Sequence, residues 1–266
     1  MSNYVIVIPA RHASTRLPGK PLLDIAGKSM IQRVWERSRG AAAAAVLIAT
    51  DDRRIADHAR GFGADVAMTD PAHPSGTDRL EEVARQRGWD DARIVVNVQG
   101  DEPLIPAAVI DQVAGNAAAD EGVAAATLAE VLTDPRRLFD PNVVKVVRDA
   151  NHRALYFSRA PIPYARDHFP QTALRDRLPD GAQWLRHIGI YAYRVGVLHR
   201  YVHWPRHSLE AMESLEQLRI LGMGERIHVD LACAPVPAGV DTPDDLARVR
   251  ALFAADSTAR AAADGT

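Results

Sequence analysis

Strand-like and helix-like segments alternate through the first 130 residues, and this alternation constrains the fold more than any other feature of the chain. The first strand-like segment, Tyr4–Ile8, is apolar on both sides, as strands buried within parallel sheets are. Further segments alternate helix and strand at 28–38, 45–49, 53–60, 65–68, 77–86, 93–98, 106–119 and 123–128. Because strand–helix–strand units build parallel sheets, we predict a three-layer α/β/α, Rossmann-like fold with a mostly parallel central sheet.

The pattern changes after Asp134-Pro135, a pair typical of helix starts. We expect paired strands at 143–148 and 154–157, an irregular loop at 160–180, strands at 187–193 and 226–231, and a helix at 209–221. A last helix is expected to begin at Thr242–Asp245 and to end near Phe253. No linker is evident, so we predict one domain over 1–254 in three parts, at about 1–130, 131–235 and 236–254, and a disordered tail over 255–266.

Composition excludes several classes of function. The net charge of −2 lacks the basic excess of a duplex nucleic-acid binder. A single cysteine, Cys233, excludes an intramolecular disulfide and a Cys-rich zinc site. No apolar run approaches the ~20 residues that span a bilayer, and the first residues carry no signal pattern. We therefore expect a cytoplasmic protein whose partners are neither nucleic acids nor membranes.

A basic loop follows the first strand in the sequence VIPARHASTRLPGK, residues 7–20, with cations at Arg11, Arg16 and Lys20. In open α/β sheets ligands bind beyond the carboxyl ends of the strands. Arginine offers a planar fork of donors to phosphate, and lysine offers a point charge. The loop is neither a Walker P-loop nor a GxGxxG fingerprint. It is either a binding loop for a nucleotide's phosphates or a solvated surface loop.

Two aspartates follow in positions that suit a metal ion. Asp101 lies in VQGDEP, directly after the strongest predicted strand, and Asp241 lies in GVDTP, just before the last helix. Magnesium is usually held by one or two carboxylates together with substrate phosphates. Alternatively, Asp101 closes a turn and Asp241 caps a helix, although Thr242 already supplies that cap. Two carboxylates and three cations around one cleft favour a site for a metal ion and a triphosphate.

Two further groups of residues carry possible chemistry. The turn Ser75-Gly76-Thr77 opens a helix, where it either holds a base or ribose or acts only as a helix cap, with Thr77 as the expected N-cap. The second half carries a group that could hold an acidic sugar or could consist of satisfied core residues: Arg159, His187, Tyr191, Glu213 and Gln217.

Taken together, these motifs resemble one known family, the CMP-Kdo synthetases (3-deoxy-manno-octulosonate cytidylyltransferases). The shared stretches run from residue 8 to about 248 and are IPARHASTRLPGKPL, SGTDRL, VNVQGDEPLIP, NVVKVV, ALYFSRAPIP, RHIGIYAYR, LEQLR and GVDTPDDL. Sialic acid cytidylyltransferases share the opening motif, whereas YFSR, RHIGIY and LEQLR narrow the resemblance to the Kdo enzymes. The chain differs at His12, where many relatives carry tyrosine.

The resemblance implies a fold, a reaction and an assembly. The fold would be that of the nucleotidyltransferases, with a nucleotide-binding part over about 1–130, a smaller subdomain for sugar binding and dimerisation over about 131–235, and a returning helix over about 236–254. The substrates would be CTP and Kdo, and the products CMP-Kdo and diphosphate. The resemblance also implies Mg²⁺ as cofactor, a homodimer, and a role in lipopolysaccharide biosynthesis.

The resemblance also implies roles for single residues. The nucleotide would be bound by Arg11, Arg16, Lys20, Ser75, Gly76, Thr77 and Gln99, and the sugar by Arg159, His187, Tyr191, Glu213 and Gln217. The metal ligands would be Asp101 and Asp241, and the catalytic residues Lys20, Arg16 and Asp101. The anomeric hydroxyl of Kdo would attack the α-phosphorus in line, with catalysis mostly by positioning and charge neutralisation. A metal-activated hydroxyl would need no separate general base.

Two alternatives remain open at this stage. One is a cytidylyltransferase for another acidic sugar, such as sialic acid or an amino-Kdo, because the same basic loop serves all of these substrates. The other is a non-catalytic nucleotide sensor on the same fold. A sensor would tend to lose the metal carboxylates, and both Asp101 and Asp241 are present.

Overall fold

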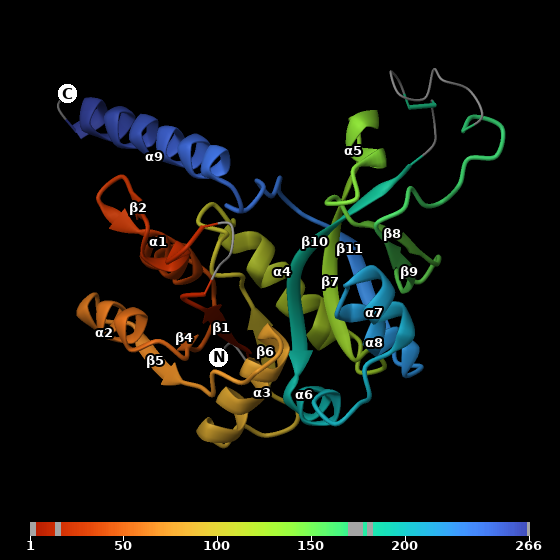
Figure 1. Ribbon diagram of the computed structural model, residues 1–266, viewed down its shortest axis with the longest axis horizontal. Helices are drawn as coiled ribbons and strands as arrows, with labels where there is room; N and C mark the ends of the chain where they lie inside the picture. The colour runs from red at the N-terminus through yellow and green to blue at the C-terminus, as the bar shows by residue number, and fades with distance from the viewer. Residues whose placement is uncertain (1–3, 14–16, 170–177, 180–182, 265–266) are drawn as a thin grey trace. The chain divides into compact units, whose positions relative to one another are not determined.

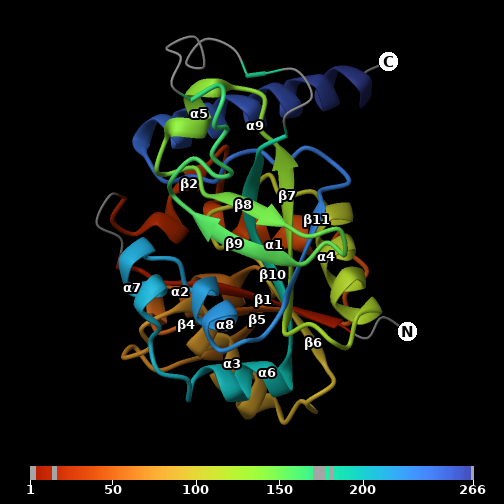
Figure 2. The same ribbon diagram turned by 90° about the vertical axis from the view of Figure 1, so that its right-hand side faces the viewer.

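The computed structural model describes residues 4–13, 17–169, 178–179 and 183–264 (Figures 1 and 2). The chain forms two compact units. The first consists of Met1–Trp89, Val95–Asp111 and Val236–Thr266, and the second of Asp90–Ile94 and Gln112–Pro235. The chain thus leaves the first unit and returns to it at Val236. The single domain predicted over 1–254 stays a prediction.

Parallel strands form the sheet of the first unit. Its order is β6 (Ile94–Asn97), β1 (Tyr4–Ala10), β4 (Val46–Thr50) and β5 (Asp65–Met68). The pairs β1–β4 and β4–β5 are parallel, and Ile8 lies opposite Ile48. The apolar run that predicted the first strand is almost fully buried. The strands predicted in this unit are therefore confirmed.

Helices cover both faces of this sheet. The helices are α1 (Met30–Ser38), α2 (Arg53–Gly61) and α3 (Gly76–Arg87). Both views place α1 and α3 on opposite sides of β1 and β4 (Figures 1 and 2). Side-chain oxygens of Ser29, Asp52 and Ser75 cap the three helices. Such residues are favoured at these positions because they accept hydrogen bonds from otherwise unpaired backbone N–H groups.

The segment after the basic loop packs against the last helix. It contains a short 3₁₀ helix (Lys20–Leu22) and the hairpin of β2 (Asp24–Ile25) and β3 (Lys28–Ser29). A buried cluster joins this segment to α9 (Pro243–Asp264): Leu17, Ile25, Met30, Val240, Leu246, Val249 and Phe253. The sequence predicted a helix that ends near Phe253 and a disordered tail from 255, whereas α9 continues to Asp264. Alanines dominate this extension, and alanine has the highest helix propensity.

The sheet of the second unit contains both parallel and antiparallel strand pairs (Figure 2). Its strands are β7 (Ala125–Val131), β8 (Lys145–Arg148), β9 (Ala154–Ser158), β10 (Leu185–Arg194) and β11 (Ile227–Leu231). β11 is parallel to β7, β10 is antiparallel to β7 and to β8, and β8 is antiparallel to β9. The predicted pairing of 143–148 with 154–157 is confirmed.

The helices of the second half depart most from the sequence prediction. They are α5 (Pro135–Phe139), α6 (Val195–Tyr201), α7 (Ser208–Glu213) and α8 (Gln217–Gly222), while α4 (Ala107–Ala119) crosses the sequence boundary between the units. α6 was not predicted. The helix predicted at 209–221 is two helices, because the backbone at Ser214 adopts a left-handed conformation with φ 52°. Among the described helices, none is both long and apolar enough to cross a membrane.

Candidate functional site

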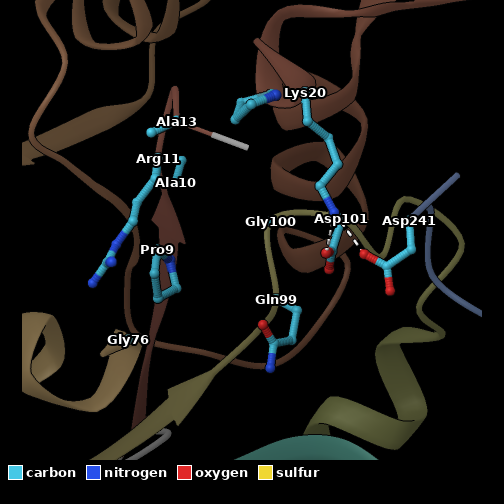
Figure 3. Close-up of a pocket in the computed structure, with 11 residues that line it drawn as sticks. Pro9, Ala10, Arg11, Ala13, Lys20, Gly76, Gln99, Gly100, Asp101 and Asp241 are labelled. Atoms are coloured by element: carbon cyan, nitrogen blue, oxygen red, sulfur yellow. Dashed lines mark hydrogen bonds and ion pairs between the residues drawn. The ribbon is translucent and has the colours of Figure 1, made fainter. Parts of the chain in front are cut away.

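A polar pocket of about 420 Å³ lies in the first unit where β1 and β6 end. Its walls come from five separate stretches of the chain (Figure 3): Pro9, Ala10, Arg11, Ala13, Lys20, Pro21, Gly76, Gln99, Gly100, Asp101 and Asp241. The structure therefore brings the predicted phosphate-binding cations Arg11 and Lys20 to the same pocket as the predicted metal ligands. This location, beyond the strand ends, is the usual ligand position in open α/β sheets.

Lys20 joins the two acidic segments (Figure 3). Its Nζ donates to Oδ2 of Asp101 at 2.7 Å, to Oδ1 of Asp241 at 3.0 Å and to the carbonyl of Val240 at 2.9 Å. Burial by itself would lower the pKa of Lys20, but the charges and hydrogen bonds of Asp101 and Asp241 together outweigh it and raise the pKa. The lysine is therefore fully protonated at neutral pH.

Local backbone interactions explain why the two carboxylates meet. The amide of Val240 donates to the carbonyl of Asp101 at 2.9 Å, which ties the loop after β6 to the segment before α9. The N-terminus of α9 is capped by Thr242 and Asp245, whose side chains accept from each other's backbone amides at 3.2 and 3.0 Å. Since Thr242 supplies this cap, as the sequence predicted, the Asp241 carboxylate faces the pocket instead.

The Asp101 and Asp241 carboxylates could also hold a divalent cation. One ammonium group contacts both of them, so the two carboxylates lie close enough together to share one positive ion. Carboxylate oxygens are the ligands that hard cations such as Mg²⁺ and Ca²⁺ prefer. The donor set of this pocket therefore fits a hard cation.

Arg11 lines the opposite part of the pocket from a fixed position. Its Nη2 donates to the carbonyl of His73 at 2.7 Å, which holds the start of the basic loop against the loop before α3. Arg16, the third predicted cation, lies outside the described residues. Gln99 and Gly76, for which the family resemblance implies nucleotide binding, line the same pocket.

Gly100 is required by a close approach of two backbones. A Cβ atom at this position would lie 2.7 Å from the carbonyl oxygen of Pro9. Contacts this short do not occur at real Cβ atoms, so any other residue must push the ends of β1 and β6 apart. Glycine here allows the close approach of two backbone segments that both line the pocket.

The Ser75–Thr77 turn is built differently from the prediction. Ser75, rather than Thr77, caps α3: its Oγ accepts from the amide of Asp78 at 3.2 Å and donates to the Asp78 carboxylate. The prediction of Thr77 as N-cap was wrong because the helix begins one residue earlier, at Gly76. Ser75 and Thr77 are both buried, which leaves Gly76 as the residue of this turn that lines the pocket.

Sequence reasoning missed a buried ion pair behind this turn. Arg79 is fully buried, and its guanidinium donates to Asp51 at 2.9 Å and to the hydroxyl of Thr69. An arginine is rarely buried unless it is paired. The pair fixes the first turn of α3 against the ends of β4 and β5. The sequence feature that could have indicated this ion pair is the arginine of SGTDRL, to which the predicted binding and catalytic roles assign no function.

In the second unit, Arg159 and Glu213 form one hydrogen-bonded group. Glu213 accepts from the hydroxyl of Ser158 at 2.6 Å and from the amide of Arg159 at 2.9 Å. The Arg159 Nε donates to the carbonyl of Glu213 at 2.6 Å, and its Nη1 donates to the carbonyl of Pro141 at 2.9 Å. Two of the predicted sugar-binding residues therefore hold each other in place.

His187 and Tyr191 are also brought together, on β10. The His187 ring packs between the rings of Phe157 and Tyr191, at 5.0 and 5.4 Å between centroids, and its Nε2 lies 3.1 Å from the hydroxyl of Thr127. Although part of the residue is exposed, burial of the ring and the nearby charge of Arg186 lower the pKa of His187 to about 3. At neutral pH this imidazole offers a hydrogen bond but no positive charge.

Gln217 lies at the start of α8, which packs against β9. The residue is 7% exposed, and among the described residues its Nε2 has no hydrogen-bond partner. A buried amide N–H without a protein partner can donate a hydrogen bond to a bound ligand.

Lys145 is a further residue that was not predicted from the sequence, and it is fully buried on β8. Its three N–H groups donate to the carbonyls of Asp140, Val143 and Arg159 at 2.9, 2.6 and 2.7 Å. Lys145 thereby clamps the backbone at Arg159. The sequence carries a signal for this role, a lysine inside the apolar strand NVVKVV. Lysine is almost never buried without partners, so a lysine in a buried strand indicates a paired ammonium group.

Comparisons with known proteins agree with these observations. The cytidylyltransferase family model matches residues 5–227. The 3-deoxy-manno-octulosonate cytidylyltransferase of Cellvibrio japonicus is 59% identical over 251 residues, covering 94% of this chain and 98% of that protein. The protein of the same name from Pseudomonas fluorescens is 59% identical over 254 residues, covering 96% and 99%.

A solved structure extends the likeness to three dimensions. The structure of a CMP:2-keto-3-deoxy-manno-octonic acid synthetase complexed with CTP matches with a TM-score of 0.86 at 44% identity, covering 96% of this chain and 100% of that one. The nucleotidyltransferase fold predicted from the sequence is therefore confirmed. Family model, sequence relatives and structure all agree, and this chain belongs to the cytidylyltransferase family and, within it, to the 3-deoxy-manno-octulosonate cytidylyltransferases.

Proposed function

We propose that this protein is a cytidylyltransferase that converts CTP and 3-deoxy-D-manno-octulosonate (Kdo) into CMP-Kdo and diphosphate. The observation that carries the proposal is the convergence of Lys20, Asp101 and Asp241, with Arg11, in one pocket at the strand ends. Relatives at 59% identity bear the name of this activity, and the neighbouring structure is described as a complex with CTP.

Arg11, Lys20 and Arg16 would bind the triphosphate of CTP. The ammonium of Lys20 would donate to phosphate oxygens instead of carboxylates, and the Arg11 fork would hold the chain of phosphates from the other side. Gly76 and Gln99 would contact the nucleoside, together with the neighbouring Ser75 and Thr77. Since Ser75 caps α3, we expect the turn to act mainly through its backbone.

Asp101 and Asp241 would hold Mg²⁺, for which their carboxylates are suitable ligands. Bound Mg²⁺ would supply charge neutralisation at the α-phosphate and favour ionisation of the attacking hydroxyl. The anomeric hydroxyl of Kdo would attack the α-phosphorus in line, and diphosphate would leave on the opposite side. Lys20 and Arg16 would offset the negative charge that develops on the phosphates.

The sugar would be bound by residues of the second unit: Arg159, His187, Tyr191, Glu213 and Gln217. Arg159 supplies the positive charge that an acidic sugar requires, because the His187 imidazole is neutral. The unpaired amide of Gln217 offers a hydrogen bond to a sugar hydroxyl. A homodimer, a cytoplasmic location and a role in lipopolysaccharide biosynthesis complete the proposal and rest on the family resemblance.

The test is diphosphate release by the purified chain with CTP, Mg²⁺ and Kdo. Controls omit the sugar or replace Kdo with sialic acid or an amino-Kdo. We expect release that requires both CTP and Kdo, with the highest kcat/KM for Kdo. A higher kcat/KM for another sugar would keep the nucleotide site and overturn the sugar assignment. CTP binding without release on any sugar would instead indicate a nucleotide sensor.

A further inference from the structure

Two imidazoles and a carboxylate meet in the second unit, outside the predicted nucleotide and sugar sites. His228 and Asp230 alternate on β11 and therefore share one face of the strand. His152 lies in the turn between β8 and β9. Its Nδ1 is 3.2 Å from Oδ1 of Asp230, and one ligand atom from each of the three residues lies within 4.8 Å of the other two.

Backbone contacts hold the turn and the strand together around these side chains. The amide of Val229 donates to the carbonyl of His152 at 2.7 Å, and Arg153 forms an antiparallel bridge with His228. His152 adopts φ 61°, in the left-handed region that few residues with side chains occupy. The surrounding hydrogen bonds therefore fix the direction from which this imidazole approaches Asp230.

The donor set suits a zinc-class ion rather than magnesium. Imidazole nitrogens and a carboxylate bind Zn²⁺, Co²⁺ and Ni²⁺ well, whereas Mg²⁺ prefers oxygen ligands. Tetrahedral ligands with bonds of about 2.0–2.1 Å lie roughly 3.3 Å apart, which agrees with the 3.2 Å between His152 and Asp230.

Neighbouring charged residues affect the affinity of such a site for a cation. Arg148 lies 3.4 Å from Asp230 and competes with a bound cation. The negative charge of Asp120 also acts on His228 and would favour a bound cation, but Asp120 is itself paired with Arg153 at 3.2 Å. Three protein ligands leave a position for water, so the site resembles an open zinc site more than a closed structural one.

We propose that His152, His228 and Asp230 bind one zinc-class divalent ion, which clips the β8–β9 turn to β11. This site is distinct from the Asp101–Asp241 pair in both its residues and its metal preference.

Cobalt titration of the metal-free full chain tests the proposal, because tetrahedral Co²⁺ with nitrogen ligands absorbs visible light. Saturating Mg²⁺ occupies the carboxylate pair during the titration. The variants are His152→Asn, whose asparagine also tolerates the left-handed backbone, and His228→Gln. The matched control is His203→Ala, which removes an exposed imidazole elsewhere in the same unit.

We expect the wild type and the control to bind one Co²⁺ with the same affinity, and each site variant to bind it at least tenfold more weakly. Zn²⁺ should raise the melting temperature of the wild type and the control but not of the variants. Equal Co²⁺ affinity in all four proteins would overturn the proposal. Failure of the wild type to take up Co²⁺ in the presence of Mg²⁺ would overturn it as well. If His228→Gln fails to fold, the His152→Asn result decides.

Discussion

Replacing Lys20 with methionine should have opposite effects on metal binding and on catalysis. The Lys20 ammonium lies 2.7 and 3.0 Å from the Asp101 and Asp241 oxygens. A cation bound to those oxygens must therefore compete with it. Methionine keeps much of the packing of the lysine stem and removes the competing charge.

The size of the effect follows from these distances. A divalent ion held about 2.1 Å from those oxygens lies at most about 5 Å from Nζ. Coulomb's law then gives a repulsion of about 1.7 kcal/mol in water-like surroundings and more in protein-like surroundings. The Asp241 side chain is 51% exposed, so the water-like value applies. Because 1.4 kcal/mol is a factor of ten, the variant should bind the ion about tenfold more tightly.

Mn²⁺ titration followed by electron paramagnetic resonance measures this affinity without nucleotide, at low ionic strength so that screening is weak. Lys28→Met is the matched control. Lys28 forms an ion pair with Glu36 at 2.7 Å, and neither residue lines the pocket. The same Lys20 variant should lose about 10²–10³-fold in kcat, as enzymes do when a donor to developing charge is removed. Unchanged or weaker Mn²⁺ binding would refute the assignment of the two carboxylates as metal ligands.

Three further perturbations test other parts of the structure. Gly100→Ala places a Cβ 2.7 Å from the Pro9 carbonyl and should raise the KM for CTP about tenfold or more, whereas Gly115→Ala, which meets no neighbour, should leave it unchanged in the same steady-state assay. Lys145→Met leaves three carbonyls without their donor, and buried acceptors left unpaired cost about 1–3 kcal/mol each, so melting temperature should fall and the KM for Kdo should rise. A lower melting temperature with an unchanged Kdo KM would limit this lysine to a structural role. His187 has a folded pKa of about 3, below its ordinary 6.5, so the stability it contributes is fully present above pH 6.5 and is lost as the pH falls toward 3. Between pH 7 and 5, the free energy of unfolding measured in urea should therefore fall by about 2 kcal/mol less in His187→Gln than in the wild type. Parallel pH profiles of the two proteins would contradict the pKa.

The location of the candidate site could be predicted because it depends on topology. Lys20, Asp101 and Asp241 are far apart in the sequence, but two of them follow predicted strands and the third precedes a predicted helix start. The ends of parallel strands meet at one edge of a sheet, so a loop after β1 and a loop after β6 must be neighbours. Hydrophobic periodicity was sufficient to find those strands.

Local backbone choices could not be predicted in the same way. The prediction of one helix at 209–221 failed because Ser214 adopts a left-handed conformation, and serine carries no strong signal for it. Thr77 and Ser75 are both good N-caps, and only the hydrogen bond from the Asp78 amide shows which one caps α3. Such choices depend on differences of about 1 kcal/mol, which tertiary contacts decide.

Two lysines, the half-buried Lys20 and the fully buried Lys145, show why side-chain roles need the structure. Both lie in motifs that the resemblance covers, and both donate three hydrogen bonds. Burial lowers the pKa of Lys145, and the charge of Arg159 adds to that, whereas the carboxylates at Lys20 outweigh burial and raise its pKa. The hydrogen-bond partners of the two lysines therefore indicate different roles for them. Charged partners can be exchanged for phosphates, so Lys20 suits catalysis, while backbone carbonyls cannot leave, so Lys145 suits a fixed clamp on Arg159.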